Sequence, residues 1–226
     1  MKIEYLIINI LILLGPLSLS FEKGVHYYRQ WKSAFTAISI VAIPYIIWDL
    51  LVCSRHWWFN PEYTLDLRLA GLPIEEWMFF ISVPFAVLFI WEIFSRRTGN
   101  PVNGRLTFVN KLLPLIILPG IFLWFQNKEY TGSTLIALGL TGIADIILKT
   151  DILSRKNTYI YLIIVAFLNL LFNGYLTARP IVIYNEVYQL GWRIFTIPLE
   201  DFIYGFSLIL FNTILFEKFK ERGNGN

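Results

Sequence analysis

The sequence has few charged residues, one cysteine and two histidines, and each of these scarcities excludes a class of protein. Charged side chains make up 15% of the 226 residues, whereas soluble domains usually carry about a quarter. The single cysteine, Cys53, cannot form an intramolecular disulfide. No Cys/His cluster indicates a metal site, and a formal charge of +3 is too small to indicate a nucleic-acid partner. The composition therefore favours a membrane protein over a cytosolic one.

Several motifs are missing as well. There is no G-x-G-x-x-G or P-loop segment, so the chain lacks the usual cradles for dinucleotides and nucleotides. It has no N-D-x-x-D element, which counts against diphosphate-dependent prenyl transfer, and residues 198–216 contain no lysine that could anchor retinal as a Schiff base. The sequence therefore predicts a function that requires no cofactor.

The chain has long apolar runs in place of charge. They cover residues 5–19, 34–53, 74–94, 112–125, 133–148, 158–176 and 198–216. A bilayer crossing takes about 17–25 residues, so we expect an all-α integral membrane protein with about seven transmembrane helices. The fourth run is short and contains Pro114 and Pro119. The first run lacks a small-residue cleavage pattern, so we interpret it as a helix and not as a signal peptide.

Positive charges are divided unevenly between the two sides of such a chain. Six of the nineteen Lys and Arg residues lie on the side of the N-terminus: Lys2, Arg55, Arg68, Lys128, Arg179 and Arg193. The other thirteen lie in the loops after the first, third and fifth runs or in the C-terminal tail. Because cytoplasmic loops carry an excess of Lys and Arg, we expect a multi-pass protein of the cell membrane with its N-terminus outside and its C-terminus in the cytoplasm.

The sequence contains an internal repeat. The segment FNPEYTLDLRLAGLPIEEWMFF (59–80) aligns without gaps on YNEVYQLGWRIFTIPLEDFIYG (184–205), at an offset of 125 residues. We infer two three-helix repeats, 1–97 and 131–226, joined by a loop and one extra helix in 98–130. Four crossings separate the third helix from the seventh, so the two repeats are expected to be parallel.

Each aligned segment carries a pair of acids just after a proline, Glu75–Glu76 and Glu200–Asp201. Proline suits the first position of a helix, which places the acids in the first turn and at the same depth in both repeats. Acids in a first turn can simply complement the helix dipole. Intramembrane acids are, however, costly and usually functional, so their duplication favours a shared cavity. Adjacent helical residues point about 100° apart, so one acid of each pair can face a substrate while the other does not.

Other residues near the acids are candidates for supporting roles. Aromatic side chains within about one turn would line an apolar pocket: Trp77, Phe79, Phe80, Phe202 and Tyr204. Asp49 is a further acid near the same membrane surface. Four polar residues match across the repeat, namely Asn60, Asn185, Arg68 and Arg193, and the arginines are expected to pair with the nearby carboxylates.

These motifs resemble the small membrane lycopene cyclases of the heterodimeric type, with both subunits fused in one chain. WDLLVCSRHWWFNPEYTLDLRLAGLPIEEWMFF resembles the first subunit, and NGYLTARPIVIYNEVYQLGWRIFTIPLEDFIYGFSLIL resembles the second. The resemblance implies an intramolecular lyase, or isomerase, of carotenoid biosynthesis that converts the ψ ends of lycopene into β rings, forming γ-carotene and then β-carotene. Its partners would be lycopene and other hydrophobic polyenes in the lipid bilayer, and contact with other carotenoid enzymes stays open.

In such a reaction an acid protonates a terminal alkene, the cation closes the ring, and a base removes a proton. The identical residues Glu75 and Glu200 are then expected to be the principal acids, with Glu76 and Asp201 as bases or proton holders. Two alternatives stay open: another carotenoid end-group enzyme, such as a monocyclase or hydratase, or a non-enzymatic seven-helix membrane module.

Overall fold

The structure, a computed structural model, describes residues 2–224 and their side chains as far as Glu221, so the side chain of Arg222 lies outside it. Its helices are α1 (Glu4–Leu19), α2 (Trp31–Val52), α3 (Ile74–Thr98), α4 (Thr107–Leu112), α5 (Ile117–Phe125), α6 (Glu129–Leu148), α7 (Lys156–Ala178) and α8 (Leu199–Asn224). Within this range six stretches are long and apolar enough to span a membrane, and α1 is a shorter apolar helix of 16 residues. This confirms the all-α membrane fold, and six of the about seven expected crossings reach spanning length.

The fourth crossing differs from the apolar run that predicted it. It extends over Gly104–Phe125 and consists of a 3₁₀ turn at Gly104–Leu106, then α4, a second 3₁₀ turn at Leu113–Ile116, and α5. Pro114 lies in this turn because it lacks the backbone N–H that a continuous α-helix would use. The crossing is therefore longer than the expected run, and it is broken near its middle.

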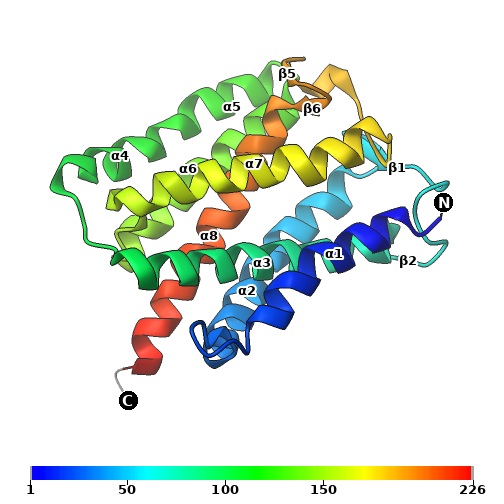
Figure 1. The fold of residues 1–226 in the computed structure, drawn as a ribbon. Helices are drawn as coiled ribbons and strands as arrows, with labels where there is room; N and C mark the ends of the chain where they lie inside the picture. Colours follow the sequence, from blue (N-terminus) through cyan, green and yellow to red (C-terminus); the bar gives the residue numbers. More distant parts are fainter. Residues whose placement is uncertain (1, 225–226) are drawn as a thin grey trace.

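The two repeats run in the same direction. Figure 1 shows that α3 and α8 both begin at the end of the bundle where the strands lie and run toward the end where the C-terminus lies. We call these the strand end and the tail end. The N-terminus lies at the strand end, opposite the C-terminus (Figure 1). The sequence-derived prediction of parallel repeats is therefore confirmed.

Short strands at the strand end position the starts of α3 and α8. Two hairpins, β2–β3 (Arg68–Leu69, Leu72–Pro73) and β5–β6 (Arg193–Ile194, Ile197–Pro198), immediately precede these helices. Their registers correspond at the repeat offset. A third pair, β1 (Trp57–Phe59) with β4 (Val182–Tyr184), is antiparallel and joins the two repeats.

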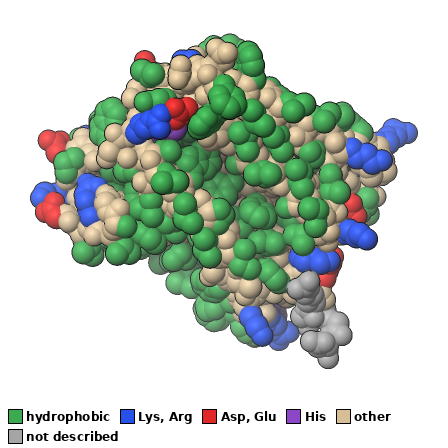
Figure 2. All heavy atoms as spheres, turned by 180° about the vertical axis from the view of Figure 1, so that it is seen from behind, with side chains coloured by type: hydrophobic (Ala, Val, Ile, Leu, Met, Phe, Trp, Pro, Cys, Tyr) green, Lys and Arg blue, Asp and Glu red, His purple; other side chains and the backbone are tan. Residues whose placement is uncertain are grey.

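The repeats are interlocked. In each repeat the first helix packs along the third, α1 on α3 and α6 on α8, whereas α2 packs on α8 of the other repeat. In their apolar windows α3 and α8 are 56% and 67% buried, compared with 17% for α7. They form the centre of the bundle, so a cavity beside their first turns is enclosed by both repeats. Figure 2 shows hydrophobic side chains over the middle of one face and charged side chains mainly toward its two ends, as a bilayer requires.

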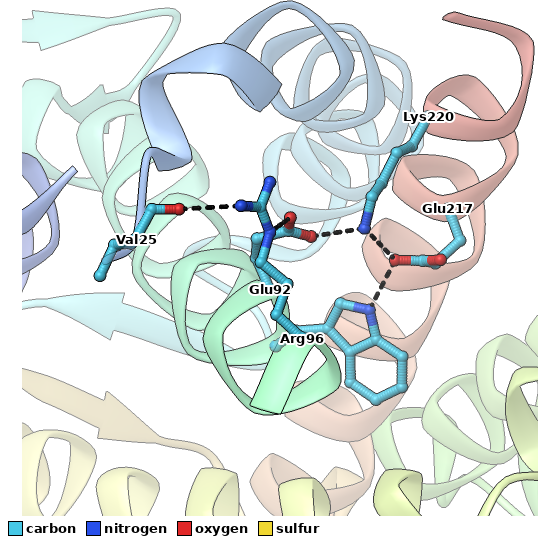
Figure 3. Close-up of polar contacts among 6 residues, drawn as sticks. Val25, Glu92, Arg96, Glu217 and Lys220 are labelled. Carbon is cyan, nitrogen blue, oxygen red and sulfur yellow. Dashed lines mark hydrogen bonds and ion pairs between the residues drawn. The ribbon is translucent and has the colours of Figure 1, made fainter. Parts of the chain in front are cut away.

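A polar cluster ties α3 to α8 near the tail end (Figure 3). Lys220 on α8 lies 2.6 Å from Glu92 on α3, a fully buried carboxylate that also pairs with Arg96. The Trp91 indole donates to Glu217 at 2.9 Å. Arg96 in turn donates to the Val25 carbonyl at 3.2 Å and so holds the α1–α2 connection. Because a buried charge needs a partner, this cluster holds the two central helices together at the tail end.

Glycines allow α5 to lie directly on α6, and replacing Gly132 with Ala is expected to destabilise the protein. The added Cβ would lie 2.6 Å from the Gly120 carbonyl oxygen and 2.7 Å from the Trp124 backbone nitrogen. Overpacking against backbone costs about 1–3 kcal/mol. Gly15→Ala is the matched control, because a Cβ there meets nothing within 4 Å. Thermal unfolding in detergent should show a lower midpoint for Gly132→Ala only, and equal midpoints would contradict the close packing.

Candidate active site

The identical acids of the repeat, Glu75 and Glu200, hold loops and do not line the cavity described below. Each is buried and accepts a backbone N–H from ten residues upstream, Leu65 at 2.7 Å and Leu190 at 2.9 Å. The two bonds are equivalent at the 125-residue offset. Thr131 also donates to Glu200, at 2.5 Å. These carboxylates therefore fix the segments that lead into α3 and α8.

The second acid of each pair, Glu76 or Asp201, lines an internal cavity of about 350 Å³. This volume lies in the lower part of the range for ligand pockets, about 300–1,000 Å³. The cavity lies beside the first turns of α3 and α8, and its walls come from both repeats, mainly α1, α3, α7 and α8. The structure thus brings one acid from each repeat to the same apolar chamber, as the parallel arrangement predicted.

The hydrogen bonds of these two acids differ. Glu76 accepts a bond from the Tyr5 hydroxyl at 2.6 Å. Asp201 accepts three, from Tyr130 at 2.5 Å, Tyr184 at 2.6 Å and Asn173 at 2.8 Å. Donors to a carboxylate favour its ionised form. Asp201 is therefore the better-supported carboxylate of the two.

Four polar partners of the acids were missed in the sequence, and two of them left a signal there. Tyr5 and Tyr130 are 125 residues apart and each follows a glutamate, so extending the repeat alignment beyond residues 59–80 would have found them. Asn173 and Tyr184 left no such signal, because the equivalent positions hold Trp48 and Phe59. The repeat therefore predicts the symmetric contacts but not the extra donors that distinguish Asp201.

Three of the five predicted aromatic residues line the cavity: Phe79, Phe202 and Tyr204. Trp77 is not among the lining residues and donates its indole N–H to the Leu69 carbonyl at 3.2 Å. Phe80 is buried in the core on another face of α3. The cavity also gains Trp57 and Phe59 from the strand that joins the repeats.

The predicted supporting residues have structural partners. Asp49 accepts the Trp57 indole N–H at 2.8 Å, next to the cavity wall. Asn60 and Asn185 stabilise equivalent turns by accepting the backbone N–H two residues later, at 3.0 and 3.2 Å. These asparagines act on the backbone of the loops and not on the acids.

Arg68 and Arg193 do not contact the paired acids at the helix starts, although Arg193 lies 3.4 Å from another nearby carboxylate, Glu186. Each guanidinium donates to a carbonyl in its own hairpin turn, Gly71 at 3.2 Å and Thr196 at 2.7 Å. The acids point into the bundle from the first turn of each helix, whereas the arginines lie on the exposed side of the strands. The two matched arginines therefore stabilise the hairpins that precede α3 and α8.

Two similar ion pairs join the repeats at the strand end. Arg179 lies 3.1 Å from Glu4, and Arg55 pairs with Glu129, which follows Glu4 by 125 residues. Each guanidinium also lies 5.0 Å from the centre of a tyrosine ring from the repeated segment, Tyr63 or Tyr188. Each ion pair therefore links one repeat to the other at the strand end.

His56 belongs to the same surface. Its Nε2 lies 3.1 Å from Glu129, and only 2% of its side chain is exposed. Burial lowers the pKa of the imidazole below its ordinary value, although Glu129 opposes this shift. A single histidine beside one carboxylate fits a structural role. In the described part of the chain, no three His, Cys, Asp or Glu side chains gather as metal ligands would.

The lowered pKa of His56 predicts that the protein loses stability in mild acid. In the unfolded chain histidine takes up a proton near about pH 6.5, whereas the folded chain resists protonation. Stability should therefore fall as the pH drops through about 6.5 toward the lower folded-state pKa. Replacing His56 with Gln should flatten the dependence of the unfolding midpoint on pH between about 7.5 and about 5. Equal slopes for both proteins would contradict a neutral, buried imidazole.

Comparison with known proteins gives one family. The model of the family described as lycopene cyclase matches residues 3–94 and 127–219. The two matched segments correspond to the two repeats and leave α4 and α5 unmatched. A search of curated proteins finds no match, and neither does a search of solved structures.

Proposed function

Because the chain belongs to the lycopene cyclase family, we propose that it is a cofactor-independent lycopene β-cyclase that acts by acid–base chemistry. The family supports a role in carotenoid biosynthesis and a hydrophobic carotenoid substrate in a membrane. The observation that carries the finer proposal is the convergence of Glu76 and Asp201 on one apolar cavity. The product has the formula of the substrate, so the residues have to supply one proton and remove another.

We assign the acid to Glu76. One of its oxygens accepts from Tyr5, and no other hydrogen-bond donor contacts Glu76 within residues 2–224, so a proton on the second oxygen can be given to the substrate. Protonation of C2 in the terminal C1=C2 alkene leaves a tertiary cation at C1. The C5=C6 alkene attacks this cation, which forms the C1–C6 bond and moves the positive charge to C5.

We assign the base to Asp201. Loss of the C6 proton to this carboxylate restores the C5=C6 double bond and completes the β ring. Its three donors hold it ionised and oriented before the cation forms. The donors Tyr130 and Tyr184 are hydroxyls; burial and the Asp201 charge hold the pKa of Tyr184 well above its usual range, so it keeps its proton.

The residues that line the cavity stabilise the cation and keep water away from it. Aromatic faces stabilise a desolvated cation by about 2 kcal/mol or more, and Phe79, Phe202 and Tyr204 supply such faces. The walls also exclude water, which would trap a tertiary cation as an alcohol. An apolar lining thus favours ring closure over hydration of the same end group.

Cyclisation in D₂O tests this function. Membranes that contain the protein, supplied with lycopene and no cofactor, should form bicyclic product with one deuterium per ring, detected by mass spectrometry. A hydroxylated product would indicate a hydratase, a single ring would indicate a monocyclase, and unchanged lycopene would indicate a non-enzymatic module. Product without deuterium would contradict proton donation by an exchangeable acid.

We also propose that the strand end lies outside the cell membrane and the tail end in the cytoplasm. The excess of Lys and Arg in the tail-end loops supports this orientation. Contact with other carotenoid enzymes stays a proposal without a defined surface.

A further inference from the structure

A second, shallower groove lies on the bundle at the place that the repeat makes equivalent to the cavity opening. Its lining residues come from α2, α5 and α6: Trp48, Ile121, Trp124, Phe125, Ser133, Ile136, Ala137 and Leu140. Those on α6 at 133, 136 and 137 correspond, at the 125-residue offset, to Ile8, Leu11 and Ile12 of the cavity. The groove between α2 and α6 is therefore the counterpart of the opening between α1 and α7.

The cavity reaches the lipid-facing surface between α1 and α7. Leu11 lines the cavity and is 58% exposed, and Phe172 on α7 lines it from the opposite side. Both helices bear many other exposed apolar side chains. A hydrophobic chain in the bilayer can therefore enter here without crossing water.

The equivalent path between α2 and α6 is closed by a tryptophan. Asn173, which lines the cavity and donates to Asp201, corresponds to Trp48 in the first repeat. The Trp48 ring lies 5.1 Å from the ring of Tyr204 and 6.4 Å from that of Tyr130, centre to centre. Both tyrosines line the cavity, so Trp48 stands between the cavity and the groove.

The joining segment adds a second cover. Ile121, Trp124 and Phe125 on α5 line the groove, and α5 is held against α6 by the backbone approach at Gly120 and Gly132. Among the described residues, no helix lies over α1 in the corresponding place. The joining segment that makes the two repeats parallel therefore also makes their two openings differ, because α5 covers the groove beside α6.

We propose that polyenes reach Glu76 and Asp201 only through the opening between α1 and α7, and that Trp48 and α5 close the equivalent path between α2 and α6. This inference rests on the proposed function, because the substrate is a polyene with two reactive ends. With one opening, the two ends are cyclised one after the other, and the one-ring intermediate leaves and turns round between the two steps.

The proposal is tested by attaching a removable bulky group at position 11 in the opening or at the equivalent position 136 in the groove. In a Cys53→Ser background, Leu11→Cys and Ile136→Cys place a thiol in the opening or in the groove, and a bulky hydrophobic methanethiosulfonate reagent is attached to each. The block at 11 should lower both polyene binding, read by visible absorbance of the purified protein, and ring formation by about tenfold or more. Reductant should restore both, and the block at 136 should change neither.

Equal effects at 11 and 136, or no effect at 11, would overturn the single opening. The binding measurement separates a wrong opening from a wrong function. If only the proposed function fails, polyene binding still depends on the label at position 11, but no ring forms. A Trp48→Ala change in the blocked Leu11→Cys protein should restore binding and turnover at least in part, because it opens the second path. Continued loss of both would overturn the role of Trp48.

Discussion

Replacing Glu76 with Gln, or Asp201 with Asn, is expected to lower ring formation by about 10²–10⁴-fold, the usual contribution of a positioned general acid or base. Each amide keeps the shape of the side chain but can neither give nor take the proton in the cavity. The measurement is product formed per folded protein from lycopene, separated by chromatography. Membrane insertion should be normal, because neither change alters the apolar surface of the bundle.

The adjacent acids provide the matched control for this experiment. Glu75→Gln and Glu200→Gln alter the same first turns, but their side chains hold Leu65 and Leu190 and do not line the cavity. We expect these variants to lose stability while each folded molecule keeps most of its turnover. Losses of 10²-fold or more at 75 and 200, with near-normal turnover at 76 and 201, would reverse the assignment in favour of the roles that the sequence suggested.

The donors to Asp201 should have the next largest effect. Removing the Tyr184 hydroxyl by Tyr184→Phe, or the Asn173 amide by Asn173→Leu, takes one hydrogen bond from an ionised group, which contributes about 1.5–3 kcal/mol. This corresponds to a loss of about tenfold to 100-fold in turnover. The two changes together should cost more than either alone while Asp201 remains present.

A double-variant comparison shows whether Tyr184 acts through Asp201 or only supports the fold. In an Asp201→Asn background the base is already absent, so adding Tyr184→Phe should lower turnover little further. Thermal midpoints measured in parallel separate loss of folding from loss of chemistry. A full additional loss in the Asp201→Asn background would show that Tyr184 acts on something other than this carboxylate.

The sequence was sufficient to predict the architecture because hydrophobic length and duplication act over many residues. Seven apolar runs and one ungapped offset predict the helices, the parallel repeats and the depth of both acid pairs. The offset extends further than the alignment showed, since Tyr5 and Tyr130 bond the second acid of each pair in the same way.

The sequence could not show which acid of each pair faces the substrate. Adjacent residues of a helix point about 100° apart, and only the packing of the upstream loop shows that Glu75 and Glu200 turn toward Leu65 and Leu190. The acids that are identical in both repeats, Glu75 and Glu200, are therefore the ones that hold the loops, because they bind equivalent backbone N–H groups. The cavity acids differ between the repeats, because one is surrounded by donors that the other lacks.

Arg68 and Arg193 do not contact the paired acids for a related reason. Closeness in sequence suggested the motif carboxylates as partners, but a two-residue turn brings a carbonyl oxygen within reach first. A repeated charge near a repeated acid can thus serve the fold of a hairpin and leave the chemistry to other residues.

The double variant Glu76→Gln with Asp201→Asn tests most directly whether the two repeats build one chamber. Residues that act as a unit are strongly non-additive. We predict that the double variant forms rings as slowly as the slower single variant, and that neither single variant retains the ability to close one ring efficiently. Closure of one ring at a near-normal rate in both single variants, with multiplied losses in the double variant, would show two independent sites and contradict the shared chamber.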